Sequence, residues 1–312
     1  MKLDKKDRKI LMELDFNARA PLSEIARKIG YSKQLVKYRL NQLEKNKVLK
    51  GTYALLDPFK IGFGCYQIFL KFQNVTWKKE REILNYICRM KQVKTVVSVG
   101  GEWDIIFVVW TRSMVELESL IEEVSLRYGK YISNKYISIS TAFYYFRHKY
   151  CYEPKDFPSF NIHIQKDVIS LDKIEFNLVD LLNKDGRLPN IEIARKLKLS
   201  PATVQKKIRD LISKGVIKGF RIMLNESALG FFQYRLYLRL KNQNLLRING
   251  LVRYLRQHRN ALFVTKAIEK TDLEINFIVQ NPREFHDIVN GLKYNFHDIF
   301  KDYDWYILYD VL

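Results

Sequence analysis

The sequence predicts an α+β fold in which one order of helices and strands occurs twice. The two parts of the 312-residue chain align without a gap at a constant offset of 168 positions, the separation of Leu3 from Leu171. In each part, a stretch with helical periodicity precedes a stretch that alternates between strand and helix patterns. A repeat this long is typical of duplicated domains, because the repeats of a solenoid are single supersecondary units.

The register of the repeat rests on identical residues. The run EIARK occupies residues 24–28 and again residues 192–196. Further along, Ser32, Gly51 and Gly62 return as Ser200, Gly219 and Gly230. We therefore define a first repeat, residues 3–144, and a second repeat, residues 171–312, and call positions that are 168 apart repeat-equivalent.

The composition indicates well-filled cores and a polyanionic partner. Hydrophobic residues make up 47% of the chain, with 19 Tyr and 19 Phe, and the formal net charge is +20. Such a charge favours nucleic acid over an anionic membrane, since no amphipathic anchor is evident, although a generally basic proteome gives the same composition. Without an apolar leader or a run of eighteen apolar residues, the chain is expected to be cytoplasmic and to bind no membrane.

The first sixty residues of each repeat have the periodicity of three short helices. The first centres on Ile10 and Leu11, and the second follows Pro21. Ser32 and its equivalent Ser200 are predicted to cap the third helix, because a serine hydroxyl can accept a hydrogen bond from a free amide of the first turn. A short helix, a turn and a capped helix form the helix-turn-helix arrangement, whose second helix enters the DNA major groove.

The outward face of the third helix is basic in both repeats, which suits contact with phosphates. Basic helix faces are usually only solvated, but an excess in the same module of both repeats favours DNA. The two faces also differ in sequence, which predicts an asymmetric or imperfectly palindromic site. The predicted DNA-binding residues are Ser32, Lys33, Gln34, Lys37, Tyr38, Arg39 and Lys50, together with Ser200, Thr203, Gln205, Lys206, Lys207, Arg209 and Lys218.

After a wing strand, each repeat continues with the pattern β-α-β-β-α-β of a ferredoxin-like domain. Alternation around Tyr66 to Phe72 predicts the first of these strands, and the periodicity from Leu117 to Val124 predicts the second helix. The fold class is thus α+β, with two copies of a winged helix-turn-helix followed by a ferredoxin-like domain. The expected domains are residues 1–60 and 171–228 for the winged helix-turn-helix, residues 61–146 and 229–312 for the ferredoxin-like fold, and residues 147–170 for a linker.

The chain resembles the Lrp/AsnC group of prokaryotic transcriptional regulators over nearly its whole length, twice. The resemblance is carried by the stretch LSEIARKIGYSKQLVKYRLNQLEKNKVLKGTYALLDPFKIGF, with Asp57, Pro58 and Gly62, and by the hairpin VGGEWDIIFVV. In that hairpin, Gly101 and Asp104 are similar to the family's Gly-x-x-Asp turn.

The resemblance implies a sequence-specific, DNA-binding transcriptional regulator that dimerises through its second domain and assembles further into even-numbered rings. It also implies an amino acid or related small molecule as effector, bound near the glycine turn. One repeat would equal one subunit, so the chain would be a covalent pseudo-dimer, paired within one chain or by exchange between chains. The implied effector residues are Gly100, Gly101, Glu102, Trp103 and Asp104, for which a role in shaping the hairpin stays open.

The equivalent turn of the second repeat has lost its glycines. Gly100 and Gly101 correspond to Ile268 and Glu269, and Asp272 alone is kept. Because a turn with a positive φ or a close backbone approach relies on glycine, effector sensing is expected in the first repeat alone or in neither.

Two alternatives to a specific regulator remain. Sirohaem decarboxylases resemble this family in fold, but the five histidines do not recur between the repeats and none lies in a glycine-turn region. No pairing of a nucleophile with a base is visible, and the cysteines, Cys65, Cys88 and Cys151, show no metal spacing, so we expect no enzyme, catalytic residue, metal or cofactor. A chromatin-like protein that coats DNA would also suit the charge, and its affinity would be nearly independent of sequence.

Overall fold

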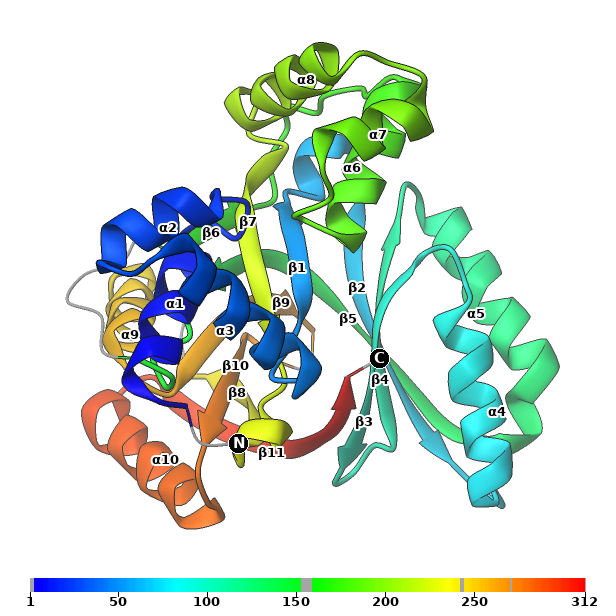
Figure 1. Cartoon of the computed structure of the whole chain (residues 1–312). Coiled ribbons are helices and arrows are strands. Elements are labelled where there is room, and N and C mark those ends of the chain that lie inside the picture. The colour runs from blue at the N-terminus through cyan, green and yellow to red at the C-terminus, as the bar shows by residue number, and fades with distance from the viewer. Residues whose placement is uncertain (1–2, 153–158, 242–243, 270, 312) are drawn as a thin grey trace. The chain divides into compact units, whose positions relative to one another are not determined.

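The computed structural model describes residues 3–152, 159–241, 244–269 and 271–311. The chain forms two compact units, each containing like parts of both repeats (Figure 1). Unit 1 comprises Met1–Ile61, Arg147–Pro158 and Asp167–Phe231, and unit 2 comprises Gly62–Phe146, Ser159–Lys166 and Phe232–Leu312. None of the helices described has the length and apolar character needed to cross a membrane.

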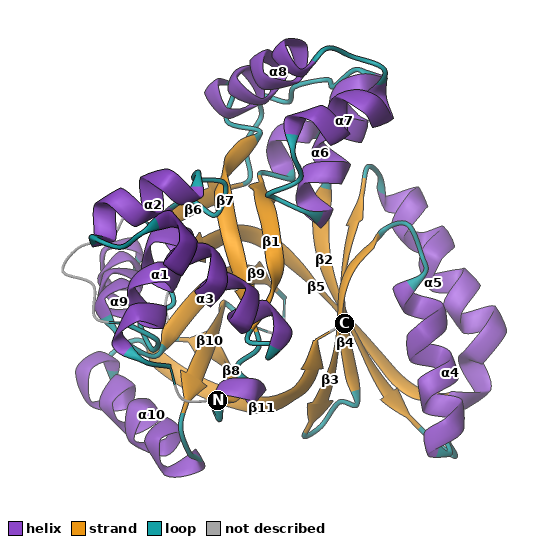
Figure 2. Ribbon diagram, viewed as in Figure 1, coloured by secondary structure: helices purple, strands orange, loops and turns teal. Residues whose placement is uncertain are grey.

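Unit 1 contains the two winged helix-turn-helix domains, in which three helices precede a strand (Figure 2). Each helix buries one apolar stripe, so the predicted helical periodicity is confirmed. The first domain consists of α1 (Lys5–Phe16), α2 (Leu22–Ile29), α3 (Lys33–Lys45) and β1 (Leu49–Leu56), followed by the short helix η1 (Phe59–Ile61). The second consists of α6 (Lys173–Lys184), α7 (Asn190–Leu197), α8 (Pro201–Ser213) and β7 (Ile217–Leu224), followed by η3 (Ser227–Leu229).

The turn between the second and third helices needs a left-handed residue in both domains. Gly30 ends α2 with φ +72°, whereas its equivalent Lys198 ends α7 with φ +55°. Glycine adopts this conformation without steric cost, while lysine does not. The second domain therefore keeps the geometry of the turn without the residue best suited to it.

The strands β1 and β7 pair antiparallel and join the two domains of unit 1. Tyr53 lies opposite Arg221, and these two residues are repeat-equivalent to each other. The contacts on either side also come in equivalent pairs: the Ala18 amide donates to the Phe220 carbonyl at 3.0 Å, and the Gly186 amide donates to the Thr52 carbonyl at 2.9 Å. The ladder therefore relates the two domains by a two-fold repetition centred on Tyr53 and Arg221.

Two equivalent arginines extend this symmetry. The Arg19 guanidinium donates to the Gly186 carbonyl at 2.7 Å, and the Arg187 guanidinium donates to the Ala18 carbonyl at 2.5 Å. A β-carbon on Gly186 would lie 2.9 Å from the Tyr53 backbone, so glycine is required there. Each domain thus fills hydrogen-bonding positions on the other.

Unit 2 contains the two β-α-β-β-α-β domains that the sequence predicts. Their apolar strand residues alternate, and the helices pack against one face of the strands, which carries Ile68 and Leu70 in the first domain and Leu236 and Leu238 in the second. The first domain consists of β2 (Gly64–Phe72), α4 (Trp77–Cys88), β3 (Val93–Gly100), β4 (Ile105–Thr111), α5 (Met114–Tyr128), η2 (Gly129–Tyr131) and β5 (Ile132–Tyr145). The second consists of β8 (Phe232–Leu240), α9 (Leu245–Gln257), β9 (Ala261–Ile268), β10 (Leu273–Val279), α10 (Pro282–Phe296) and β11 (Phe300–Val311).

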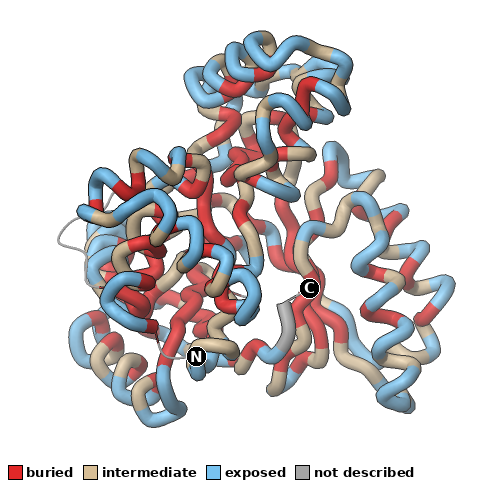
Figure 3. Tube along the Cα trace, in the orientation of Figure 1, coloured by how far each residue is buried: buried red, intermediate tan, exposed pale blue. Residues whose placement is uncertain are grey.

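The strands of the two domains of unit 2 form a closed cycle, and β6 pairs with β5 outside it. Their order is β2-β4-β3-β11-β8-β10-β9-β5-β6, and β2 also pairs with β5. Strands of different repeats meet where β3 pairs with β11 and where β5 pairs with β9, and we call these junctions seam A and seam B. Besides the helix-covered cores, a third core gathers aromatic residues of both repeats, among them Phe69, Trp103 and Tyr237. In Figure 3, buried positions gather along the strands, whereas the helices combine buried with exposed positions.

Residues 147–170, expected to form a linker, contribute to both units. Tyr150, Cys151 and Tyr152 are buried, and β6 (Phe160–His163) pairs with β5. Pro154 and Pro158, which suggested the linker, lie outside the described residues. The aromatic residues before them supply enough apolar surface to pack, which the proline signal obscured.

Candidate nucleic-acid interface

The third helix of each winged domain begins at the predicted serine. The Ser32 hydroxyl accepts a hydrogen bond from the Leu35 amide at 3.1 Å, and the Ser200 hydroxyl accepts one from the Thr203 amide at 3.1 Å. These hydrogen bonds confirm both predicted N-caps, and both serines are exposed. The caps fix where α3 and α8 start, and with it which residues the first turn presents.

Removing either cap should weaken its domain. We expect S32A and S200A each to lower the free energy of unfolding by about 1 kcal/mol, because each leaves an amide of the first helical turn without its acceptor. Urea unfolding followed by circular dichroism measures this, with the exposed Ser170→Ala as the matched control. Equal losses in all three variants would contradict a capping role.

The outward face of α3 is open to solvent. Val36 and Leu40 are buried, whereas Lys33, Gln34 and Lys37 are exposed, and 60% of Tyr38 is accessible. Two cations, an amide and a phenol thus occupy one helical surface. These groups can donate to phosphate oxygens or to base edges.

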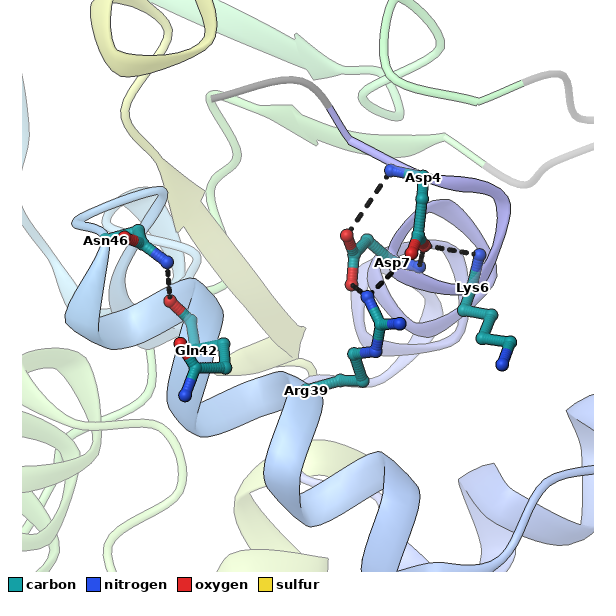
Figure 4. Close-up of polar contacts among 6 residues, drawn as sticks. All are labelled: Asp4, Lys6, Asp7, Arg39, Gln42 and Asn46. Carbon is teal, nitrogen blue, oxygen red and sulfur yellow. Dashed lines mark hydrogen bonds and ion pairs between the residues drawn. The ribbon is translucent and has the colours of Figure 1, made fainter.

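Arg39, also predicted to bind DNA, is directed toward α1. Its guanidinium lies 2.6 Å from the Asp4 carboxylate and 3.4 Å from that of Asp7 (Figure 4). Asp4 is the N-cap of α1 and accepts from the Lys6 and Asp7 amides, and the hydrogen bond from the Asp7 backbone is the main cause that lowers its pKa. Burial raises the pKa of Asp7. Arg39 therefore links α3 to α1 through these ion pairs.

The second repeat has the same arrangement with other side chains. Lys207 lies 3.4 Å from Asp172 and 3.9 Å from Glu175, the equivalents of Asp4 and Asp7. Sequence reasoning missed these acidic partners, although each pair has the capping-box spacing of three residues that indicates a helix start.

At the other end of α3, in the first repeat, the Asn46 side-chain amide donates to the Gln42 carbonyl at 2.8 Å (Figure 4).

The outward face of α8 is also basic but differs in detail. Gln205, Lys206 and Arg209 are exposed, and Thr203 is partly exposed beside the cap. Pro201 occupies the first turn, where its missing amide costs no hydrogen bond. The face thus offers two cations and an amide beyond a rigid start.

The two wing lysines have different surroundings. Lys50 is exposed, whereas its equivalent Lys218 is partly buried, with its ammonium 3.6 Å from the buried Asp57 carboxylate. Lys50 is therefore the more accessible to a phosphate. On α7, Arg195 and Lys196 are exposed as well, and the sequence prediction did not assign them to the interface.

The glycine turn of the first repeat forms a hairpin in unit 2. Gly101 has φ +144°, and Trp103 is buried in the aromatic core. The Asp104 carboxylate accepts from the Phe72 amide at 2.6 Å and from the Lys71 ammonium at 3.0 Å. Asp272 accepts from the Leu240 amide at 2.7 Å in the same way, so both aspartates tie the hairpin to a neighbouring strand.

Glu102 carries the exposed side chain of the turn. Its carboxylate accepts from the Tyr306 hydroxyl at 3.1 Å. Among the predicted effector residues, it is the side chain that offers a charge at the surface.

The histidines are spread over the chain, with His286 in α10 and His297 at the C-cap of that helix. His148 is buried in unit 1, with Nδ1 3.0 Å from Asp15, and His258 follows α9, whereas His163 belongs to β6. Within the described ranges, no group of three or more His, Cys, Asp or Glu side chains has the geometry to hold a metal ion.

A small cavity in unit 2 is lined mainly by aromatic residues, including Phe69 and Tyr136.

Two family models match the winged domains. Residues 3–44 match an AsnC-type helix-turn-helix domain, and residues 171–218 match a winged helix-turn-helix DNA-binding domain. Both matches begin at repeat-equivalent positions.

Two relatives that are named as transcriptional regulators or activators match part of the chain. An uncharacterized HTH-type transcriptional regulator of Pyrococcus furiosus is 32% identical over 140 residues, which are 45% of this chain and 93% of that protein. The proline dehydrogenase transcriptional activator of Rhodobacter capsulatus is 31% identical over 122 residues, 39% of this chain and 79% of that protein. Each therefore matches less than half of the chain but most of its own length.

A solved structure shares the fold over nearly the whole chain. The siroheme decarboxylase NirDL matches with a TM-score of 0.65 and 13% sequence identity, covering 98% of this chain and 92% of that one. At this identity, the likeness shows the fold alone.

Proposed function

The chain belongs to the Lrp/AsnC family of DNA-binding helix-turn-helix transcriptional regulators, and we propose that it acts as a sequence-specific regulator in the form of a covalent pseudo-dimer. The observation that carries the proposal is the pair of capped helices, α3 and α8, whose exposed basic faces belong to domains joined by the β1–β7 ladder. The contacts across that ladder come in pairs related by two-fold symmetry. One chain therefore supplies two recognition helices, as a dimer of single-repeat subunits would.

The proposed DNA site has two unequal half-sites. Lys33 and Lys37 of α3 correspond to Pro201 and Gln205 of α8, so equivalent positions offer different groups to the grooves. Arginine and lysine suit guanine or phosphate, and glutamine suits adenine. A regulator with two different recognition faces should therefore prefer an imperfect palindrome.

For an effector, the proposal remains the first hairpin, residues 100–104. The exposed Glu102 offers a carboxylate that would attract the ammonium group of an amino acid. The second hairpin has Lys270 at the equivalent position, a residue outside the described part of the chain. Isothermal titration with the twenty amino acids tests this site, with E102Q as the control variant.

Selection from random duplex DNA at near-physiological salt tests the main proposal. We expect enrichment of a site with two unequal half-sites separated by a whole number of helical turns, and a much higher affinity for that site than for scrambled DNA. Absence of enrichment, with affinity that falls steeply with salt for every duplex, would instead indicate sequence-independent coating.

The fold shared with siroheme decarboxylase NirDL over 98% of this chain favours an enzyme as the second candidate. We rank it second because the relatives similar in sequence are named as regulators, and because residues 100–104 and 268–272 include no histidine. A titration with an iron tetrapyrrole, followed by its visible absorbance, distinguishes the two. A saturable spectral shift at micromolar concentration would support the enzyme.

A further inference from the structure

Seams A and B of unit 2 have the same register. Ile307 of β11 lies opposite Gly100 of β3 in seam A, and Ile139 of β5 lies opposite Ile268 of β9 in seam B. These two pairs are repeat-equivalent. The seams therefore bring equivalent positions together, and they can be compared residue by residue.

Seam A places a large side chain over a glycine. One position beyond the Ile307 pair, a β-carbon on Gly101 would lie 2.5 Å from Cδ1 and 3.0 Å from Cε1 of Tyr306. The Tyr306 ring is only 4% exposed and packs against Tyr237 with ring centroids 5.0 Å apart. Because these ring atoms are held by packing, the close approach is possible only without a side chain on residue 101.

In seam B, the larger and the smaller side chain exchange places. Glu269 takes the position of Gly101, and the fully buried Ser138 takes the position of Tyr306. Glu269 keeps a positive φ of +105°, so the turn persists although the residue has a side chain. In seam B, a serine thus lies opposite a glutamate of the turn. In seam A, a tyrosine lies opposite a glycine of the turn.

Unit 1 contains a second asymmetric pair. Asp15 of the first repeat is fully buried, and its carboxylate lies 3.4 Å from the guanidinium of Arg221 in the second repeat, which is 2% exposed. The equivalent positions are Asn183 and Tyr53. The buried carboxylate and this arginine therefore come from different repeats.

We propose that these two features select pairing of a first repeat with a second repeat over pairing of like repeats. Two first repeats would leave Ser138 opposite Gly101 in both seams, with the volume of the tyrosine ring empty. Two second repeats would force Glu269 against Tyr306 in both seams, and would set Arg221 directly opposite another Arg221 without the carboxylate of Asp15. The inference rests on the pairing of repeats in the proposed pseudo-dimer.

The test counts pairs after the covalent link is cut. The intact folded chain carries a protease site introduced at residues 153–158; it is cleaved, equilibrated in mild urea, returned to buffer and analysed by native mass spectrometry. We expect like pairs to be less than about a tenth of all pairs, against the statistical share of about half. A wild-type protein that gives the statistical share would overturn the proposal.

A variant built from the protein's own residues should lose the selection. The substitutions G101E, Y306S, D15N and R221Y copy the equivalent residues of the other repeat, so both seams and both charge positions become alike. We expect like pairs to rise several-fold toward the statistical share. A variant that still forms almost only mixed pairs would contradict the assignment to these residues.

A double-mutant cycle in the uncut chain keeps the seam testable if the fourfold variant does not fold. G101E should lower the urea midpoint clearly, and Y306S should recover part of that loss by removing the clash, although the positive φ of residue 101 still strains a side chain there. Additive effects would contradict the contact. S138Y with and without E269G is the matched cycle in seam B. DNA binding and the mass of the uncut chain are measured separately. The distribution of pairs can therefore be interpreted even if the protein does not act as a regulator.

Discussion

Replacing Asp15 with alanine is expected to lower the free energy of unfolding by about 3–5 kcal/mol, because the substitution removes a buried carboxylate from among buried cations. The carboxylate accepts from the His148 amide at 2.9 Å and lies 3.4 Å from the Arg221 guanidinium. It also accepts from the Tyr152 hydroxyl, and Arg147 is close by. Without Asp15, these donors stay buried but lose the charge that they surround.

The pH dependence of this effect has a definite sign. Burial alone would raise the pKa of Asp15, but the charges of His148 and Arg221 hold it far below its usual value. A lowered pKa in the folded state stabilises the fold above the unfolded pKa of about 4, and that contribution is lost as the pH falls further. The difference between wild type and D15A should therefore shrink as the pH falls below about 4.

Urea unfolding of D15A and of D180A at several pH values measures the effect. Asp180 pairs with Lys184 at 2.7 Å, but the two side chains are 50% and 71% exposed, so solvent screens the pair and the loss should stay below about 1 kcal/mol. Similar losses in D15A and D180A would show that the buried cluster does not act as described.

The local structure of both repeats could be predicted from the sequence because its signals lie close together along the chain. The serine caps, the apolar stripe of α3 and the alternation in β2 each involve neighbouring residues. Arg39 shows the limit of this reasoning. Its place in the helical period indicates the outer face, but Asp4 and Asp7, more than thirty residues earlier, attract its guanidinium inward.

The pairing of strands from different repeats could not be predicted. Alternation marks β1, β7 and β11 as strands, but a strand pattern does not specify its neighbour. The burial of Asp15 was equally hidden, because its partners come from β7 and from residues that resembled a linker. Gly101 illustrates the consequence: its loss in the second repeat suggested a lost effector site, while in the structure it makes room for Tyr306.

Replacing Lys33 and Lys37 together with alanine is expected to lower the affinity for the selected duplex about 10- to 100-fold, since both ammonium groups lie on the exposed face of the capped helix α3. If each neutralises one phosphate, the slope of log affinity against log salt should become less steep by about 2. Fluorescence anisotropy with labelled duplexes over a series of salt concentrations measures both quantities.

The contrast with two other variants separates a recognition surface from net charge. K91A/K301A removes the same charge from exposed positions in unit 2 and should change affinity less than about threefold. R39A should instead act mainly through stability, because Arg39 already pairs with Asp4 and Asp7. If K33A/K37A and K91A/K301A weaken specific and scrambled DNA equally, binding follows total charge, and α3 does not read the site. A loss confined to the selected duplex would place Lys33 or Lys37 at base edges, whereas a uniform loss across sequences would place them at phosphates.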